Sequence, residues 1–188
     1  MRKKMYLLAG GPGGGDSTAD ALRAALRESG REHPAVAYIG TANGDSRSFM
    51  KWFEAPLRRA GAASLTMAPL VGKRADRAAA ERLLRESSVI FLSGGEVEDG
   101  MNGLDAGIRA LLAQRREEGA LFLGLSAGSI MLGHAWPHWD DEDRRPDDAV
   151  LFGCLGFADA IFDTHAEAEG WPELQKAVAL AGDGFVGY

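Results

Sequence analysis

The fold of this 188-residue chain is decided by residues 121–131, LFLGLSAGSIM. The first five residues are apolar apart from one glycine, which is typical of a strand buried on both faces of a parallel sheet. Small residues then surround Ser126, and a helical stretch follows. A tight turn from strand to helix exposes a serine hydroxyl at the edge of the sheet. The segment therefore predicts a nucleophile elbow at Ser126.

Upstream of this segment, short apolar runs alternate with stretches of helical period. Such alternation with short connections predicts an α/β fold with a doubly wound, mostly parallel sheet flanked by helices, in a single domain over residues 1–188. The expected strands are 5–9, 36–39, 63–67, 89–92 and 120–125, and the expected helices are 16–29, 46–60, 74–85 and 105–118. In such a sheet the carboxyl ends of the strands form the site.

The alternation of apolar runs with helical stretches ends after residue 133. The polar, acidic stretch 134–148 reads as a long loop. The later segments are interpreted as short apolar runs at 150–152 and 160–162, a helix at 172–181 and the start of a strand at 184–188.

Composition excludes several classes of function. The formal charge of −6 and the pI of about 5.2 argue against nucleic-acid binding. No apolar stretch approaches the roughly 20 residues that a spanning helix needs, so no membrane association is expected. The single cysteine, Cys154, cannot form an internal disulfide and fits a reducing compartment, so we expect a cytoplasmic protein.

A serine nucleophile needs a base and donors for the oxyanion. The first backbone N–H groups of the helix after Ser126 point at the reacting centre, and Gly95, which follows the strand 89–92, could supply a second donor. Among the four histidines, His165 is the first choice for the base because it follows a short apolar segment. His33 is expected to be exposed, and His134 and His138 come soon after the elbow. The alternative is a plain strand–helix junction with Ser126 as its N-cap.

Three further patterns leave alternatives open. The glycine-rich loop 10–15 could cradle a phosphate, but it lacks the spacing of known nucleotide motifs and is better read as a loop at the rim of the site. A divalent cation could bind an acidic cluster, although the ligand spacing is irregular. A substrate pocket or a subunit contact could use tryptophans that flank the site segments. The cluster is His138, Asp140, Asp141 and Asp143, and the tryptophans are Trp136, Trp139 and Trp171.

The chain resembles the peptidase E and cyanophycinase family of serine peptidases from Met5 to its last residue. The resemblance rests on Gly-x-Ser-Ala-Gly after a strand, a Gly-Gly turn about thirty residues earlier and Asp-x-His about forty residues later. It implies a parallel sheet related to class I glutamine amidotransferases, with Ser126 as nucleophile, His165 as general base, and Gly95 and Ala127 as oxyanion donors. It implies no metal or organic cofactor, a small peptide substrate, and a monomer or a homodimer.

The resemblance leaves the third catalytic residue open. In dipeptidase relatives an Asp about fifteen residues beyond the serine has this role, which points to Asp141 with Asp140 beside it. In cyanophycinase-like members the acid is a Glu in a Gly-x-x-Glu stretch. Here that stretch would begin at Gly187 and continue beyond Tyr188, so we expect the displayed chain to be truncated. Glu167 and Glu169 lie near His165 in sequence but do not fit either pattern.

Substrate choice also departs from the family pattern. Relatives cleave dipeptides with an N-terminal aspartate, or the aspartyl-arginine units of cyanophycin, and often carry an Arg shortly after the catalytic His. Here residues 166–173 read AEAEGWPE, which would repel a carboxylate. We therefore expect a serine peptidase for dipeptides or short peptides. The aspartyl dipeptidase type stays open, although a substrate with a free amine or a neutral or basic side chain fits the local charge better. The alternative is a catalytically silent small-molecule or peptide-binding protein on the same scaffold.

Overall fold

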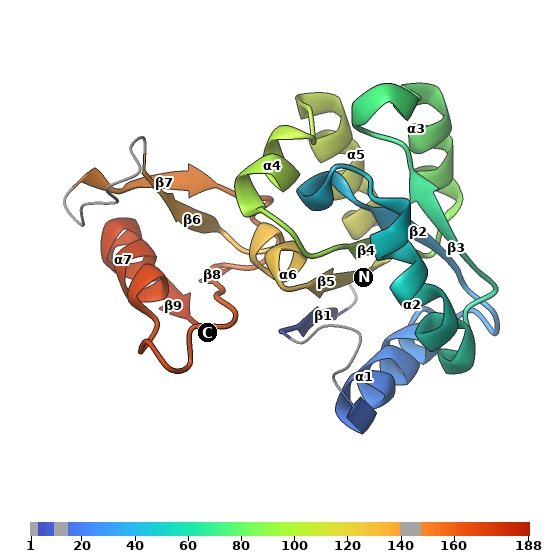
Figure 1. The fold of residues 1–188 in the computed structure, drawn as a ribbon, viewed down its shortest axis with the longest axis horizontal. Coiled ribbons are helices and arrows are strands. Elements are labelled where there is room, and N and C mark those ends of the chain that lie inside the picture. The colour runs from blue at the N-terminus through green and yellow to red at the C-terminus, as the bar shows by residue number, and fades with distance from the viewer. Residues whose placement is uncertain (1–3, 10–14, 140–147) are drawn as a thin grey trace.

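A five-stranded parallel sheet forms the centre of the computed structural model, which describes residues 4–9, 15–139 and 148–188 (Figure 1). The order of its strands is β1-β5-β4-β2-β3, and every neighbouring pair is parallel. The strands are β1 (Met5–Leu8), β2 (Ala35–Ile39), β3 (Ser64–Ala68), β4 (Val89–Leu92) and β5 (Leu121–Leu125). Because β5 lies between β1 and β4, its carboxyl end is flanked by the ends of two other strands.

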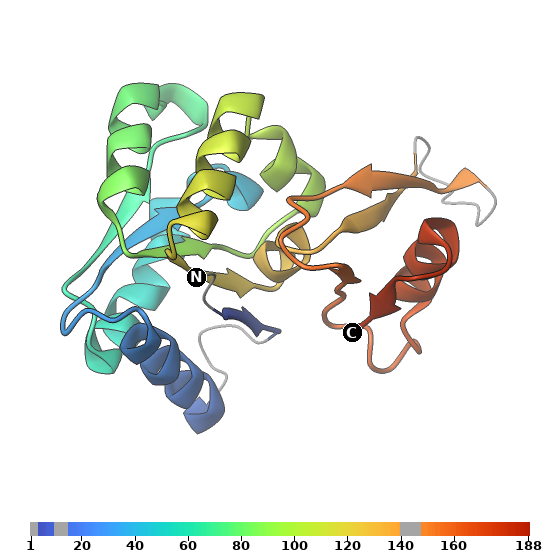
Figure 2. The ribbon, with the colours of Figure 1, turned by 180° about the vertical axis from the view of Figure 1, so that it is seen from behind.

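Helices cover both faces of the sheet, which confirms the α/β class (Figures 1 and 2). One apolar core packs α1 (Gly15–Glu28) and α2 (Arg47–Ala60) against one face. The core on the opposite face takes residues from α3 (Arg77–Glu86), α4 (Val97–Asn102), α5 (Ala106–Glu117) and α6 (Ala127–Met131). Side chains alternate between the faces of a strand, so both faces of β4 and β5 are apolar and buried.

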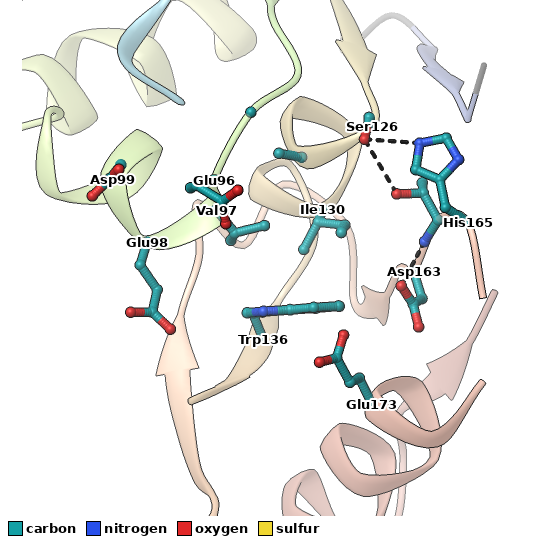
Figure 3. Close-up of a pocket in the computed structure, with 13 residues that line it drawn as sticks. Glu96, Val97, Glu98, Asp99, Ser126, Ile130, Trp136, Asp163, His165 and Glu173 are labelled. Carbon is teal, nitrogen blue, oxygen red and sulfur yellow. Dashed lines mark hydrogen bonds between the residues drawn. The ribbon is translucent and has the colours of Figure 1, made fainter. Parts of the chain in front are cut away.

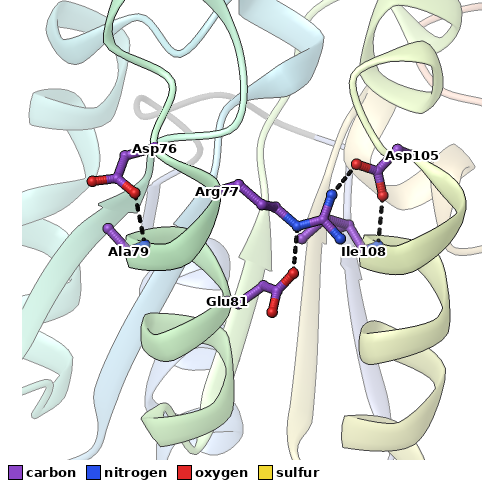
Figure 4. Close-up of polar contacts among 6 residues, drawn as sticks. All are labelled: Asp76, Arg77, Ala79, Glu81, Asp105 and Ile108. Atoms are coloured by element: carbon purple, nitrogen blue, oxygen red, sulfur yellow. Dashed lines mark hydrogen bonds and ion pairs between the residues drawn. The ribbon is translucent and has the colours of Figure 1, made fainter.

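Helix starts follow the capping residues in the sequence. Ser46, Asp76 and Asp105 each accept a hydrogen bond from the backbone N–H three residues later. Figure 4 shows two of these caps and Arg77, which pairs with Glu81 on its own helix and with Asp105 at the start of α5. The ion pairs are partly exposed and therefore contribute little to stability.

The C-terminal part of the chain lies beside the sheet, next to α6 and β1 (Figures 1 and 2). An antiparallel pair, β6 (Ala135–His138) with β7 (Val150–Gly153), begins it. The prediction of a continuous loop over 134–148 is therefore wrong at 135–138, and residues 140–147 lie outside the described part. A short parallel pair, β8 (Ala160–Ile161) with β9 (Val186–Gly187), and the helix α7 (Pro172–Ala181) complete it.

Within the described residues, no helix has the length and apolar character needed to cross a membrane.

Candidate active site

Ser126 occupies a strained backbone position between β5 and α6. Its φ of 49° and ψ of −119° place a non-glycine residue in the left-handed half of conformational space. Such a conformation costs on the order of 1–3 kcal/mol and persists only where the surroundings enforce it. The N–H of Ser126 donates to the carbonyl of Leu8 at 2.7 Å. Ser129 adds a second link to β1, because its Oγ lies 3.1 Å from both the N and the O of Leu8.

Two glycines allow this turn to pack. A Cβ on Gly124 would lie 2.6 Å from the Cα of Ser129, and a Cβ on Gly128 would lie 2.1 Å from the carbonyl oxygen of Leu92. Both contacts are with backbone, which cannot move aside without shifting a strand or the helix. The small residues around Ser126 are thus required by packing at the junction of β4, β5 and α6.

His165 lies beside this serine although 39 positions separate them. Its Nε2 is 3.1 Å from Ser126 Oγ, a normal hydrogen-bond distance (Figure 3). Thr164 also approaches, with its Oγ1 3.4 Å from the same oxygen. His165 is exposed and has a φ of 73°, so a turn between β8 and α7 carries it. The structure thus brings together the two residues that the sequence suggested as nucleophile and base.

Asp163 holds the segment that carries His165. Its N–H donates to the carbonyl of Tyr188 at 3.0 Å, next to the β8–β9 pair. Its Oδ1 accepts the N–H of Thr164 at 2.6 Å. Burial raises the pKa of Asp163, while the N–H groups of Thr164 and Leu174 and the charge of His165 act in the opposite direction. The buried carboxylate therefore links β8, the turn and the start of α7.

No third catalytic residue is visible in the described part of the chain. Within residues 4–9, 15–139 and 148–188, no side chain forms a hydrogen bond to Nδ1 of His165. Asp140 and Asp141 lie outside these ranges. Glu167 and Glu169 are exposed and make no hydrogen bond to His165. The role assigned to Asp141 stays a prediction.

The proposed oxyanion donors flank Ser126 at the pocket. Gly95 and Ala127 both line it. Gly95 has a φ of 142°, and a Cβ there would lie 1.9 Å from the carbonyl oxygen of Ala42, so only glycine fits. Ala127 is the first residue of α6, where backbone N–H groups have no partner within the helix.

Asn43, which sequence analysis missed, fixes the orientation of the Gly94–Gly95 peptide. It ends a short 3-10 turn, Thr41–Asn43, after β2. Its Nδ2 donates to Ser93 Oγ at 2.8 Å and to the carbonyl of Gly94 at 2.9 Å. In a planar trans peptide the N–H points opposite to the carbonyl. Asn43 therefore turns the N–H of Gly95 away from itself. No sequence pattern connects residues 50 positions apart.

A cavity of about 400 Å³ opens beside Ser126 (Figure 3). Its apolar wall comes from three side chains on three elements, namely Val97, Ile130 and Trp136. Its charged lining is mostly acidic and consists of Glu96, Glu98, Asp99, Asp163, Glu173 and the imidazole of His165. The candidate nucleophile, the candidate base and both proposed oxyanion donors all line this cavity, so a scissile carbonyl bound there would be within their reach.

The other candidate residues lie elsewhere or have other contacts. His33 is exposed beside Glu32, and the ring of His134 lies 4.0 Å from that of Phe185. His138 Nδ1 lies 2.6 Å from Glu98 Oε1. The three aspartates of the suggested cation cluster lie outside the described residues, so the cluster stays a prediction. Residues 10–14 of the glycine-rich loop also lie outside them. Burial raises the pKa of the Cys154 thiol to about 12, so it is not a thiolate nucleophile at neutral pH.

Comparison with known proteins gives one family and several structural neighbours. The model of Peptidase family S51 matches residues 5–183. The fold is similar to a peptidase from an acI-B1 Actinobacterium, with a TM-score of 0.70 and 16% identity over 97% of this chain and 76% of that one. It is also similar to a putative peptidase E protein from Listeria monocytogenes EGD-e, with a TM-score of 0.65 and 14% identity over 94% of this chain and 88% of that one. No curated protein matches the chain.

Proposed function

The chain belongs to peptidase family S51, and from this premise we propose that it hydrolyses dipeptides or short peptides through an acyl-enzyme on Ser126. His165 would accept the proton of Ser126 Oγ as the oxygen attacks the scissile carbonyl. The N–H groups of Gly95 and Ala127 would stabilise the oxyanion that forms. His165 would then protonate the leaving amine, and water would hydrolyse the acyl-enzyme by the reverse sequence of proton transfers.

One observation carries the proposal: His165 Nε2 lies 3.1 Å from Ser126 Oγ, and both residues line the cavity. A serine that merely capped α6 would need no imidazole beside it, and its side chain makes no capping hydrogen bond to the helix. The strained backbone of Ser126 supports the same reading, because strain of this kind collects at reactive sites.

The direct test measures hydrolysis of a panel of dipeptides and tripeptides by the wild type and by Ser126→Ala. We expect the variant to lose activity by at least about 10³-fold, because the covalent route is removed. Ser64→Ala, at an exposed position at the start of β3, is the matched control and should retain full activity. Full activity of Ser126→Ala would refute the mechanism. A preference for tripeptides or longer chains over dipeptides would refute the dipeptidase assignment alone.

A second candidate function is a silent binding protein on the same scaffold. It is favoured by the absence, in the described residues, of a hydrogen bond to Nδ1 of His165, since a base without an orienting partner is weakly activated. In that case the cavity would bind a small molecule or a peptide without cleaving it. Equilibrium binding of uncleaved peptides, with no turnover by the wild type, would support this candidate.

We further propose a reducing compartment such as the cytoplasm as the site of action, because the sequence has one cysteine and so cannot form an internal disulfide.

A further inference from the structure

We propose that a second cavity, at the carboxyl ends of β2 and β3, binds a small molecule that carries a phosphate or carboxylate group. Three basic side chains that line it, Arg47, Lys73 and Arg74, would hold the anionic group, and we call it the cationic cavity. This site goes beyond the proposed hydrolysis of peptides, and its test does not depend on that activity.

The cationic cavity is separate from the cavity beside Ser126. It has a volume of about 450 Å³, within the range for small-molecule sites, and the two cavities share no lining residue. Its walls come from the turn after β2, the start of α2, the segment after β3 and the start of α3. Because β4 and β2 lie between β5 and β3, at about 4.8 Å per strand, β3 is about 14 Å from β5. Parallel α/β sheets bind ligands at this carboxyl edge.

The basic side chains of the cationic cavity are the first observation. Arg47, Lys73 and Arg74 are exposed, and within the described part of the chain none of them forms an ion pair or a side-chain hydrogen bond. Arg77 nearby is different, because acidic side chains on α3 and at the start of α5 pair with it (Figure 4). Charges of one sign around a concave site attract a ligand of the opposite sign. The protein as a whole has a formal charge of −6, so this excess of positive charge is local.

The two acidic residues of the cationic cavity bind backbone N–H groups. Asp45 Oδ2 accepts the N–H of Leu70 at 2.7 Å and that of Val71 at 2.9 Å, and its Oδ1 is buried. Asp76 Oδ1 accepts the N–H of Ala79 at 3.0 Å as the cap of α3 (Figure 4). Neither carboxylate forms an ion pair with a residue that the structure describes. The three basic side chains therefore keep their charge for a ligand.

The remaining lining of the cationic cavity offers contact to an apolar part of the ligand. The hydrogen bonds of Asp45 join the segment after β3 to the turn after β2, so this wall is in place before a ligand binds. The planar fork of an arginine matches the oxygen atoms of a phosphate or a carboxylate. An anionic group on a small apolar body therefore fits the site. The apolar lining residues are Met67, Pro69, Val71 and Ala79.

The test measures equilibrium binding by calorimetry with three probes that share a phenyl ring. The probes are phenyl phosphate, 3-phenylpropionate and the neutral 3-phenylpropionamide. We expect a Kd of about 1 mM or tighter for at least one anion, and binding of the amide that is at least about tenfold weaker. The Kd of the anion should rise with salt. Tighter binding of phenyl phosphate would identify a phosphate ester as the ligand, and tighter binding of phenylpropionate a carboxylic acid. Either order supports the site.

Variants test the position of the bound anion. Arg47→Gln and Lys73→Gln should each weaken binding by about threefold or more, and the double variant by about tenfold or more. Both side chains are exposed, so the variants should fold. Arg58→Gln is the matched control, because it makes the same change of charge on α2 at an exposed position outside the cationic cavity, and it should bind as the wild type does. Ser126→Ala should also bind as the wild type does.

Four results would overturn the inference. The first two are equal binding of the amide and the anions, and no binding of either anion at about 10 mM. The others are unchanged binding by the double variant and loss of binding in Ser126→Ala. None of these results bears on whether Ser126 and His165 hydrolyse peptides, and a failure of the proposed hydrolysis would leave the binding measurement valid.

Discussion

Ser126 and His165 meet at one hydrogen bond but lie in regions that are built in opposite ways. Ser126 follows a strand whose five residues are all buried, and it precedes a helix whose residues are buried as well. His165 is exposed and lies on a turn after β8, a strand of two residues outside the main sheet. Ser126, the proposed nucleophile, is therefore positioned by the core of the fold. His165, the proposed base, is positioned by a few contacts at Asp163 and Tyr188.

This difference separates stability from activity. A change near Ser126 disturbs packing between β4, β5 and α6, so its cost should appear in the free energy of unfolding. A change at His165 removes little buried area and should appear almost entirely in the rate. The same packing explains the glycines at positions 124 and 128 of this chain, where a methyl group has no space.

The largest effect is expected from His165→Gln. Loss of the base should lower kcat/KM by about 10³-fold, because general-base assistance contributes roughly 10²–10⁴ and the serine is poorly nucleophilic without it. Thermal unfolding should stay near that of the wild type. The control is His33→Gln, which changes an exposed histidine that does not line the cavity, and it should match the wild type in both measurements. Retained activity of His165→Gln would remove the imidazole from the mechanism.

Gly128→Ala tests the other half of the comparison. The added Cβ would meet the carbonyl oxygen of Leu92 at 2.1 Å, so we expect a loss of about 3 kcal/mol in the free energy of unfolding. Gly153→Ala adds the same methyl group where nothing lies within 4 Å, and should be nearly neutral. Urea unfolding of both variants makes the comparison. Equal stabilities would show that the elbow is not tightly packed.

Asn43→Ala tests whether the elbow region includes the Gly94–Gly95 peptide. Without the amide, the N–H of Gly95 loses its fixed direction, so kcat should fall by about 10–100-fold with little change in KM. Asn102→Ala, at an exposed position at the end of α4, is the control. A proportional rise in KM with unchanged kcat would assign Asn43 to substrate binding instead.

The smallest expected effect is the contribution of Asp163 to the pH dependence of the free energy of unfolding. Burial raises the pKa of Asp163 above its ordinary value of 3.8, so its contribution to stability is fully present below the unfolded-state pKa and is lost as pH rises through the folded-state pKa. Asp163→Asn lacks this dependence. Relative to the variant, the wild type should therefore lose stability as pH rises from the unfolded-state pKa of Asp163 to its raised folded-state pKa, as measured by urea unfolding. The opposite slope would mean that the ionised carboxylate is well paired.

Much of the framework followed from the sequence because each signal is local. The apolar runs at 89–92 and 121–125 are buried strands, and Ser46, Asp76 and Asp105 start helices as short polar side chains do. The short helix α4 escaped notice because its six residues include Gly100 and show no periodic apolar pattern. The strand β6 was read as loop because Pro137 and His138 interrupt its apolar pattern.

The sequence predicted the site residues only where a single residue type, such as serine or histidine, indicates the chemistry. Ser126 stands in a recognisable turn, and His165 was one of four histidines. Asn43 acts through an amide held against the carbonyl of Gly94, a contact with no sequence signature. The acidity of the cavity likewise depends on α4 and α7 facing each other, although residues 166–173 gave part of it.

The most direct test of the account is labelling of the native protein with a fluorophosphonate, followed by mass spectrometry of the modified peptide. Such a probe forms a stable adduct only with an activated serine. We predict one adduct, on Ser126, formed at least about 10²-fold more slowly in His165→Gln than in the wild type. No labelling of the folded wild type, or labelling of Ser126 at the same rate without His165, would contradict the claim that this pair is catalytic.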